Sequence, residues 1–222
     1  MHPKLRHLLN QHVVAGLHKQ LRLQAVVGQR PWTFDLPTST LRFGDDLAFA
    51  TQVLGTESER SKTWLWSWAN EESQMPPECV KAALKLRAIG TGSGIDELAA
   101  PQLPTKSVSA QDLALVATGL FGAGGFYRGP YEGGAIWLML VDQRLAAREP
   151  IDAQMAIAHF TQAIMDLPIT DHATAFSGYM QWLEWSFSRT AATALVAIDP
   201  AGRQVTAEFD AHHRLVSLTA AA

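Results

Sequence analysis

The side chains with the most evident binding chemistry lie in one segment, Phe126-Tyr127-Arg128-Gly129-Pro130-Tyr131-Glu132-Gly133-Gly134. Arg128 supplies a guanidinium fork for carboxylate or phosphate groups, Tyr131 a phenolic hydroxyl, and Glu132 a carboxylate. The glycines around them favour a hairpin turn, and the simpler alternative is a turn whose charged tips are only solvated. We take Arg128, Tyr131 and Glu132 as candidate binding residues.

Three tryptophans form a second candidate group in the segment Thr63-Trp64-Leu65-Trp66-Ser67-Trp68-Ala69-Asn70. Their two-residue spacing places Trp64, Trp66 and Trp68 on one face of a β-strand. Such a strip is wide, stiff and apolar, so something large must cover it. The cover is a packed core, a ligand in a pocket or a partner protein, and the sequence leaves these three alternatives open.

Catalytic signatures are missing from the sequence. It contains neither a Gly-x-Ser-x-Gly elbow nor a His-Glu-x-x-His helix. Glu71 and Glu72 follow the tryptophan strand, but adjacent acids at a strand end are usually solvated. Cys79 is a lone thiol, which is more often a small core residue than a nucleophile. We therefore predict no catalytic residue. The alternative is a small enzyme that uses carboxylates in an aromatic pocket.

Cofactor and metal signatures are equally weak. The run Gly90-Thr91-Gly92-Ser93-Gly94 lacks the Gly-Lys-Ser/Thr ending of a phosphate loop and follows a predicted helix, so we read it as a turn between helices. His212 and His213 are adjacent at a predicted turn, and the other histidines do not stand at ligand spacings. The sequence predicts no cofactor and no metal.

Composition narrows the class of protein. The chain has 222 residues, 47% of them hydrophobic, and a net charge of −3, which argues against nucleic acid as a partner. Its single cysteine allows no internal disulfide, so the fold needs no oxidising compartment. The longest apolar run, Ala135–Val141, is too short to span a membrane, and the N-terminus does not resemble a signal peptide. We expect a cytoplasmic protein that does not interact with membranes.

The first hundred residues change from helical to strand periodicity. Leucines and valines at three- and four-residue steps predict an amphipathic helix over residues 4–27. Alternation from Trp32 onward, broken by short polar turns, predicts three strands before the tryptophan strand and thus a four-stranded antiparallel meander. Pro76-Pro77 then begins a helix that we expect to end at Gly90, before a short helix near residues 95–99.

The rest of the chain is expected to contain several helices and a second meander. Ser109 and Asp112 resemble a capping box for a helix to Phe121. The strand Ala135–Val141 is apolar on both faces and should be central in a sheet. The remaining expected segments are a linker at residues 101–107, a helix over 151–166, a helix capped by Thr170 whose stripe reaches Phe187, and strands at 194–198, 204–209 and 215–218.

These elements predict an α+β fold in which antiparallel β-meanders pack on amphipathic helices. We expect residues 1–222 to form one domain with two architecturally similar halves. The first, residues 1–100, is a helix plus a four-stranded meander. The second, residues 108–222, has helices, a central strand and a three-stranded meander. A long helix followed by a meander is the plan of cystatin-like and NTF2-like folds, in which a curved sheet wraps one helix.

Several segments resemble an uncharacterised bacterial family known only as a domain of unknown function. The segments that carry the resemblance are Trp32-Thr33-Phe34-Asp35-Leu36, Gln52-Val53-Leu54-Gly55-Thr56, Thr63–Asn70, Phe126-Tyr127-Arg128-Gly129-Pro130 and the strand ending at Phe209-Asp210. The resemblance covers residues 5 to 218, and the tryptophan-rich strand is its most specific part. It implies a soluble bacterial α+β protein and no activity.

The sequence therefore favours a non-catalytic binding or protein-interaction protein. A curved sheet around a helix leaves an aromatic cone that suits an apolar small molecule, although aromatic side chains can equally fill it. An exposed aromatic strip would instead suit a protein partner or a second copy in a homo-oligomer.

Overall fold

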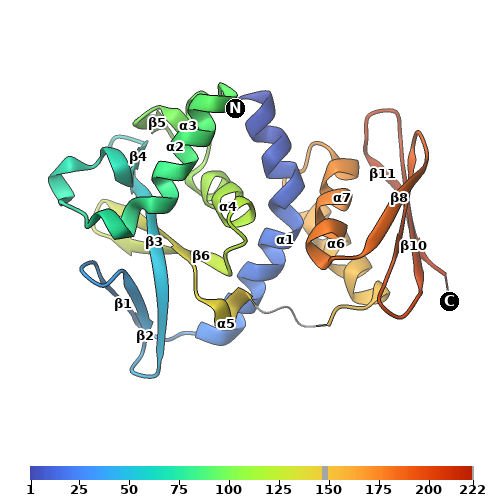
Figure 1. Ribbon diagram of the computed structural model, residues 1–222, viewed down its shortest axis with the longest axis horizontal. Helices are drawn as coiled ribbons and strands as arrows, with labels where there is room; N and C mark the ends of the chain where they lie inside the picture. Colours follow the sequence, from blue (N-terminus) through green and yellow to red (C-terminus); the bar gives the residue numbers. More distant parts are fainter. Residues whose placement is uncertain (147–149, 222) are drawn as a thin grey trace. The chain divides into compact units, whose positions relative to one another are not determined.

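The computed structural model describes residues 1–146 and 150–221, and these divide into two compact units (Figure 1). The first unit holds the described residues 1–5 and 19–146, and the second holds residues 6–18 and 150–221. Helix α1 (Pro3–Val27), confirmed over the span that the periodicity predicts, contributes residues to both units. Two antiparallel sheets pack against helices, so the α+β class is confirmed.

The first unit is built on a seven-stranded antiparallel sheet. Its strands are β1 (Trp32–Asp35), β2 (Thr40–Phe43), β3 (Leu47–Ser58), β4 (Thr63–Trp66), β5 (Gln102–Pro104), β6 (Gly125–Tyr131) and β7 (Gly134–Leu140). Its other helices are α2 (Lys81–Ser93), α3 (Asp96–Ala99), α4 (Ala110–Leu120) and α5 (Gln143–Ala146), with 3₁₀ turns at Ser67–Ala69, Glu71–Ser73 and Pro77–Val80.

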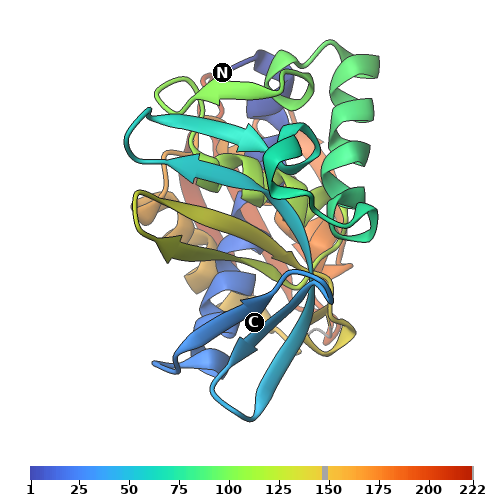
Figure 2. The ribbon, with the colours of Figure 1, turned by 90° about the vertical axis from the view of Figure 1, so that its left-hand side faces the viewer.

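Strand β3 is the long element around which this sheet is arranged (Figure 2). Strands β1 to β4 follow one another as antiparallel neighbours, so the predicted meander is confirmed. On its other side β3 pairs with β7, and β7 also pairs with β6. The apolar strand β7 is therefore central, as its sequence predicts. Strands from residues 1–100 and from residues 108–222 consequently share one sheet.

The tryptophan segment corrects one expectation. Strand β4 ends at Trp66, and Trp68 lies in the 3₁₀ turn Ser67–Ala69, so the three indoles do not share one strand face. The N–H of Trp66 still donates to the carbonyl of Pro101, and beyond it Ser67 donates its hydroxyl to the carbonyl of Val53 as the chain enters the 3₁₀ turn. Trp64 and Trp66 remain on the same face of β4.

Two expectations about the segment after residue 80 were also wrong. Gly90 lies inside α2 rather than at its end, and Gly94, with a φ of +67°, forms the cap. Gly90 is needed because α3 packs against it: a Cβ there would lie 2.6 Å from Cβ of Leu98. The expected linker contains β5, which pairs with β4. The capping box of Ser109 and Asp112 on α4 is confirmed.

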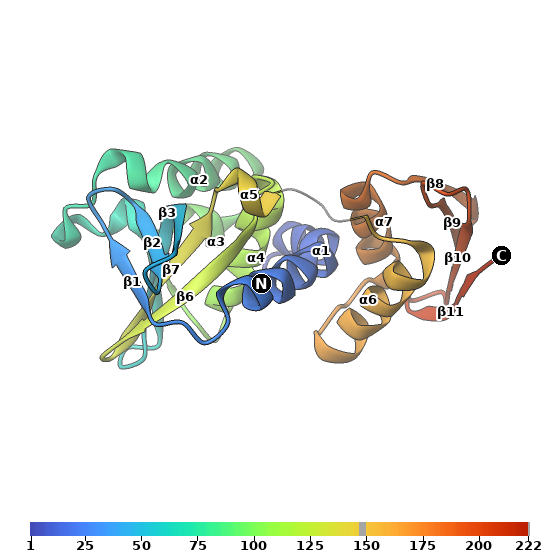
Figure 3. The ribbon, with the colours of Figure 1, turned by 90° about the horizontal axis from the view of Figure 1, so that it is seen from below.

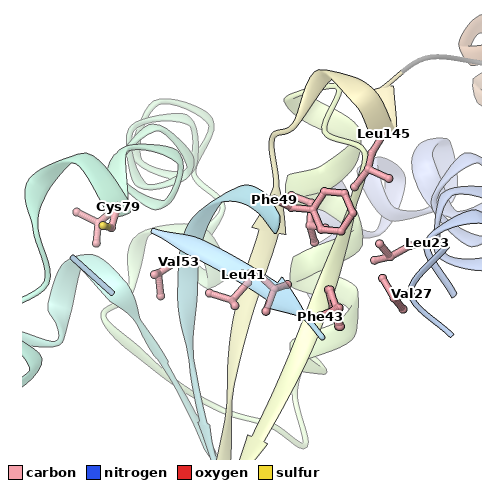
Figure 4. Close-up of a cluster of buried hydrophobic side chains, with 11 residues drawn as sticks. Leu23, Val27, Leu41, Phe43, Phe49, Val53, Cys79 and Leu145 are labelled. Carbon is pink, nitrogen blue, oxygen red and sulfur yellow. The ribbon is translucent and has the colours of Figure 1, made fainter. Parts of the chain in front are cut away.

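A buried apolar cluster fills one side of the first unit's sheet (Figure 4). Leu23 and Val27 of α1 meet side chains from β2 and β3, so the end of this helix covers that face. The rings of Phe43 and Tyr127 pack edge to face at 4.9 Å. Residues labelled in Figure 4 are Leu23, Val27, Leu41, Phe43, Phe49, Val53, Cys79 and Leu145.

The second unit is a two-layer structure in which two helices lie on one face of a four-stranded sheet (Figure 3). The helices are α6 (Ala153–Asp166) and α7 (His172–Leu183), and the strands are β8 (Ser186–Ala191), β9 (Ala194–Ile198), β10 (Gln204–Phe209) and β11 (Leu215–Ala220). The helix cap is Asp171 rather than Thr170. Phe187 lies in β8, an additional strand, rather than on the stripe of α7.

Within the part of the chain that the structure describes, no helix is both long enough and apolar enough to cross a bilayer.

Candidate functional site

Arg128 lies on strand β6 rather than at a turn, and its guanidinium joins the carboxylates of Glu57 on β3 and of Glu59 in the turn after β3. Its Nη2 donates to Oε1 of Glu59 at 3.1 Å, and its Nε lies 3.7 Å from Oε2 of Glu57. Glu57 also accepts a hydrogen bond of 3.3 Å from Nε1 of Trp137 on β7. The strand order β6-β7-β3 brings these side chains together, and one arginine is shared between two carboxylates.

The two other polar candidates of this segment are not part of that cluster. Tyr131 ends β6 with half of its surface exposed, and its ring packs over Gly134 of the β6–β7 hairpin. Glu132 is exposed at the tip of the hairpin. The structure therefore separates Arg128, which has fixed partners, from Tyr131 and Glu132, which lie at the surface.

The aromatic candidates are mostly core. Trp64 and Trp66 are fully buried, and their rings pack edge to face at 5.2 Å. Trp64 also meets Trp137 at 6.4 Å. Trp68 is half-buried and lies under the guanidinium of Arg87, 4.3 Å from the ring centroid. Neither of the two strand tryptophans offers a surface to a ligand or a partner.

The residues weighed for catalysis do not converge. Glu71 and Glu72 are exposed in a 3₁₀ turn. Cys79 is buried in the apolar cluster and donates its thiol to the carbonyl of Leu36 at 3.3 Å. In the described residues, no group of three or more His, Cys, Asp or Glu side chains is placed to hold a metal ion.

A groove in the second unit gathers polar side chains from four separate segments. We call it the α7 groove, and its volume is about 200 Å³. Its lining comes from α1, α7, β8 and the turn before β11. The lining residues are His7, Gln11, Ala173, Thr174, Ser177, Gly178, Gln181, Arg189 and His213.

Close packing of α1 on α7 forms one wall of the groove. Gly178 permits this approach, because a Cβ at that position would collide with the backbone carbonyl of Gln11. The amide Nε2 of Gln11 lies 3.5 Å from Oε1 of Gln181, which joins the two helices again. His7 stands one helical turn before Gln11, on the same face of α1.

Backbone contacts at turns position His213 and Arg189 at the groove. The backbone N–H of His172 donates to the carbonyl of His213 at 3.0 Å, which ties the β10–β11 turn to the start of α7. Arg189 stands near the end of β8 and donates from Nη1 to the carbonyl of Ala192 at 2.7 Å. His213 has a φ of +61°, a left-handed conformation that fits the tight turn.

The lining of the groove is rich in hydrogen-bond donors. None of its nine lining residues is acidic, whereas Arg189 is permanently charged and the side chains of His7, Gln11, Gln181 and His213 carry N–H donors. A carboxylate beside the lining is that of Asp171, which caps α7 by accepting from the backbone N–H and the hydroxyl of Thr174, both at 2.8 Å. Asp171 also lies 3.7 Å from Nδ1 of His213. Such a site suits an anionic group.

A second polar cluster of this unit is internal. Nδ1 of His159 on α6 lies 3.3 Å from Nδ1 of His18 and 3.1 Å from the hydroxyl of Tyr179 on α7. Burial lowers the pKa of His159 and raises the pKa of Tyr179 well above its usual range. The ring of Trp182 stacks on Tyr179 at 5.9 Å. The neutral forms of both groups are therefore favoured, and the cluster serves packing.

Sequence reasoning did not identify the α7 groove. Its residues are spread from position 7 to position 213, and His7 and His213 had been considered only as metal ligands, for which their spacing was unsuitable. A capping Asp171 followed by a helix with small residues at positions 173, 174, 177 and 178 is the one local signal, since small residues permit close helix packing.

Comparison with known proteins gives one match. The model of a family of unknown function (DUF6882) matches residues 6–143. Searches of the curated proteins and of the solved structures returned no match. The matched residues include the tryptophan segment and β6, and the β8–β11 sheet lies outside them.

Proposed function

The chain belongs to this family of unknown function (DUF6882), whose description carries no activity, and we propose that the protein is a non-catalytic binding protein. Its site is the α7 groove, and its ligand is an anionic group. The single observation that carries this proposal is the lining of the groove, in which Arg189, His7 and His213 converge without an acidic neighbour on the lining. A guanidinium with flanking imidazoles and amides recognises carboxylate or phosphate oxygens.

The two buried tryptophans of β4 argue against an apolar ligand at that strand. Trp64 and Trp66 fill the space that an apolar molecule would need on their side of the sheet. The second unit, with two helices on one face of an antiparallel sheet, keeps the cystatin-like plan as a hypothesis.

Titration of the whole protein with inorganic phosphate and with succinate, at constant ionic strength, tests the proposal. We expect backbone NMR signals to shift at Ser177, Gly178 and Arg189, and to saturate. Arg189→Gln should weaken this binding about tenfold, the usual loss for a charge-assisted hydrogen bond. Arg42→Gln is the control, because Arg42 is an exposed arginine on β2 of the other unit. Shifts that are spread over the surface, or equal losses in both variants, would contradict the proposal.

A further inference from the structure

Strand β8 forms an uncovered edge of the second unit's sheet. The strand order is β11-β10-β9-β8, so in the described part of the chain β8 pairs only with β9. All six of its residues are exposed. The backbone groups on its outer side therefore have the arrangement to which an additional strand can bind.

The usual protections of an edge strand are weak here. Proteins block such edges with proline, lysine, bulges or a covering element. Strand β8 reads Ser-Phe-Ser-Arg-Thr-Ala and has neither proline nor lysine. Its bulge lies between Arg189 and Ala191, at the end of the strand, and residues 186–189 keep a regular register with β9. Four consecutive residues are thus available for pairing.

The two larger side chains of β8 point to the same face of the sheet as the α7 groove. Phe187 is registered with Ala197, and Arg189 with Leu195, and both partners on β9 are buried beneath the helices. Phe187 is nevertheless 38% exposed, because no further strand lies beside it in the described chain. Arg189 lines the groove. A strand added to β8 would place alternate side chains beside Phe187 and at the groove.

We propose that β8 binds an extended segment of a partner protein as an additional antiparallel strand, with an acidic side chain opposite Arg189 at the α7 groove. This inference rests on the proposed function, since the acidic side chain is the anionic group that the groove holds. In an antiparallel pairing, the residue two positions after the acid lies opposite Phe187, so an apolar residue belongs there. The partner segment therefore reads acidic, any residue, apolar.

Charge complementarity selects such a partner over a second copy of this chain. In an antiparallel pairing of two β8 strands about Ser188, each Phe187 would lie opposite the other copy's Arg189. That pairing brings no carboxylate to Arg189, His7 and His213, and it adds another arginine beside the donor-rich lining. An acidic segment instead brings a carboxylate to the permanently charged Arg189, with the two imidazoles beside it as hydrogen-bonding groups.

Fluorescence anisotropy of the whole protein with labelled nine-residue peptides tests the inference. The probe contains serine and threonine, with one glutamate and, two positions later, one phenylalanine. We expect it to bind, and we expect replacement of glutamate by glutamine, or Arg189→Gln in the protein, to weaken binding about tenfold. A peptide with phenylalanine before glutamate should bind more weakly. Equal affinity for the two orders would overturn the antiparallel assignment.

Two further peptides, methylated on alternate backbone amides, separate strand addition from simple binding of the anion. One of the two methylation patterns should abolish binding, because it removes the amides that face β8.

If both methylated peptides bind as well as the parent, strand addition is wrong while the anion groove stands. If succinate binds and no peptide does, strand addition is again wrong, and the proposed anion binding stands. If neither binds, both proposals fail. If the protein is a dimer that Ser188→Arg dissociates and the peptide does not, the edge is assigned to a second copy of this chain.

Discussion

The indole of Trp64 occupies the space in which a side chain on Gly55 would stand. A Cβ built on Gly55 would lie 2.6 Å from Cζ2 and 2.8 Å from Cε2 of that indole. It would also lie 2.5 Å from the backbone oxygen of Leu65 on the paired strand β4. The glycine of β3 therefore allows β4 to hold its tryptophan flat against the sheet.

Gly55→Ala should consequently destabilise the protein by about 2–3 kcal/mol, because a methyl group here displaces both a buried ring and a strand backbone. Urea unfolding of the variant measures the loss. Gly92→Ala is the matched control: it lies in helix α2 with nothing within 4 Å of its added Cβ, so it should stabilise by about 0.5–1 kcal/mol. A stability unchanged by Gly55→Ala would mean that the indole does not pack on the strand.

Trp66→Ala should cost about 3–5 kcal/mol, the usual loss for truncating a buried aromatic side chain. The ring is fully buried, packs edge to face on Trp64, and donates from Nε1 to the carbonyl of Glu97 at 3.1 Å. The comparison variant is Trp68→Ala, whose half-buried ring should give a smaller loss. Equal losses in chemical denaturation would argue that the three tryptophans form one continuous strip after all.

The helices and strands that local sequence patterns determine were predictable. The end of α2 and the strand β8 were not, because local patterns did not determine them. The change of period from 3.6 to 2 predicted α1 and the first meander. Helix α2, however, is capped by Gly94 rather than Gly90, because the choice between two glycines depends on the packing of Leu98. Strand β8 was missed because Phe187 continues the apolar spacing of α7, while the helix ends at Glu184 in a left-handed conformation, φ +61°, that its residue type does not indicate.

The candidate sites were harder to predict than the helices and strands, because they depend on contacts between residues far apart in the sequence. Arg128 was recognisable as a polar residue of interest, but its contact with Glu57 and Glu59 exists only because β7 separates β6 from β3 in the sheet. The α7 groove joins residues that are up to 206 positions apart (His7 and His213). No local pattern encodes such a meeting, since it is set by how helices and turns pack.

A charge at a loop tip contributes little to stability, so its removal would leave stability unchanged. Arg128→Ala should instead destabilise the protein by about 1 kcal/mol. The guanidinium side chain is 39% exposed, so solvent screens its two ion pairs, and the loss should shrink in high salt. A double-mutant cycle with Glu59→Gln measures the coupling directly. A coupling of zero at low salt would show that the arginine and the carboxylate are only neighbours in space.

His159 should make stability depend on pH below neutrality. Burial lowers its pKa in the folded protein, so the unfolded chain binds the proton first and acid favours unfolding. The stabilising contribution is complete above the ordinary histidine pKa of about 6.5 and is lost as the pH falls towards the lower folded value. Urea unfolding at several pH values should therefore show that stability declines more steeply with falling pH in the natural protein than in His159→Gln.

Tyr179→Phe is the control. It removes only the hydroxyl 3.1 Å from the imidazole and should keep the steep decline, because burial rather than that hydrogen bond lowers the pKa of His159. A decline that disappears in Tyr179→Phe would assign the effect to the tyrosine instead.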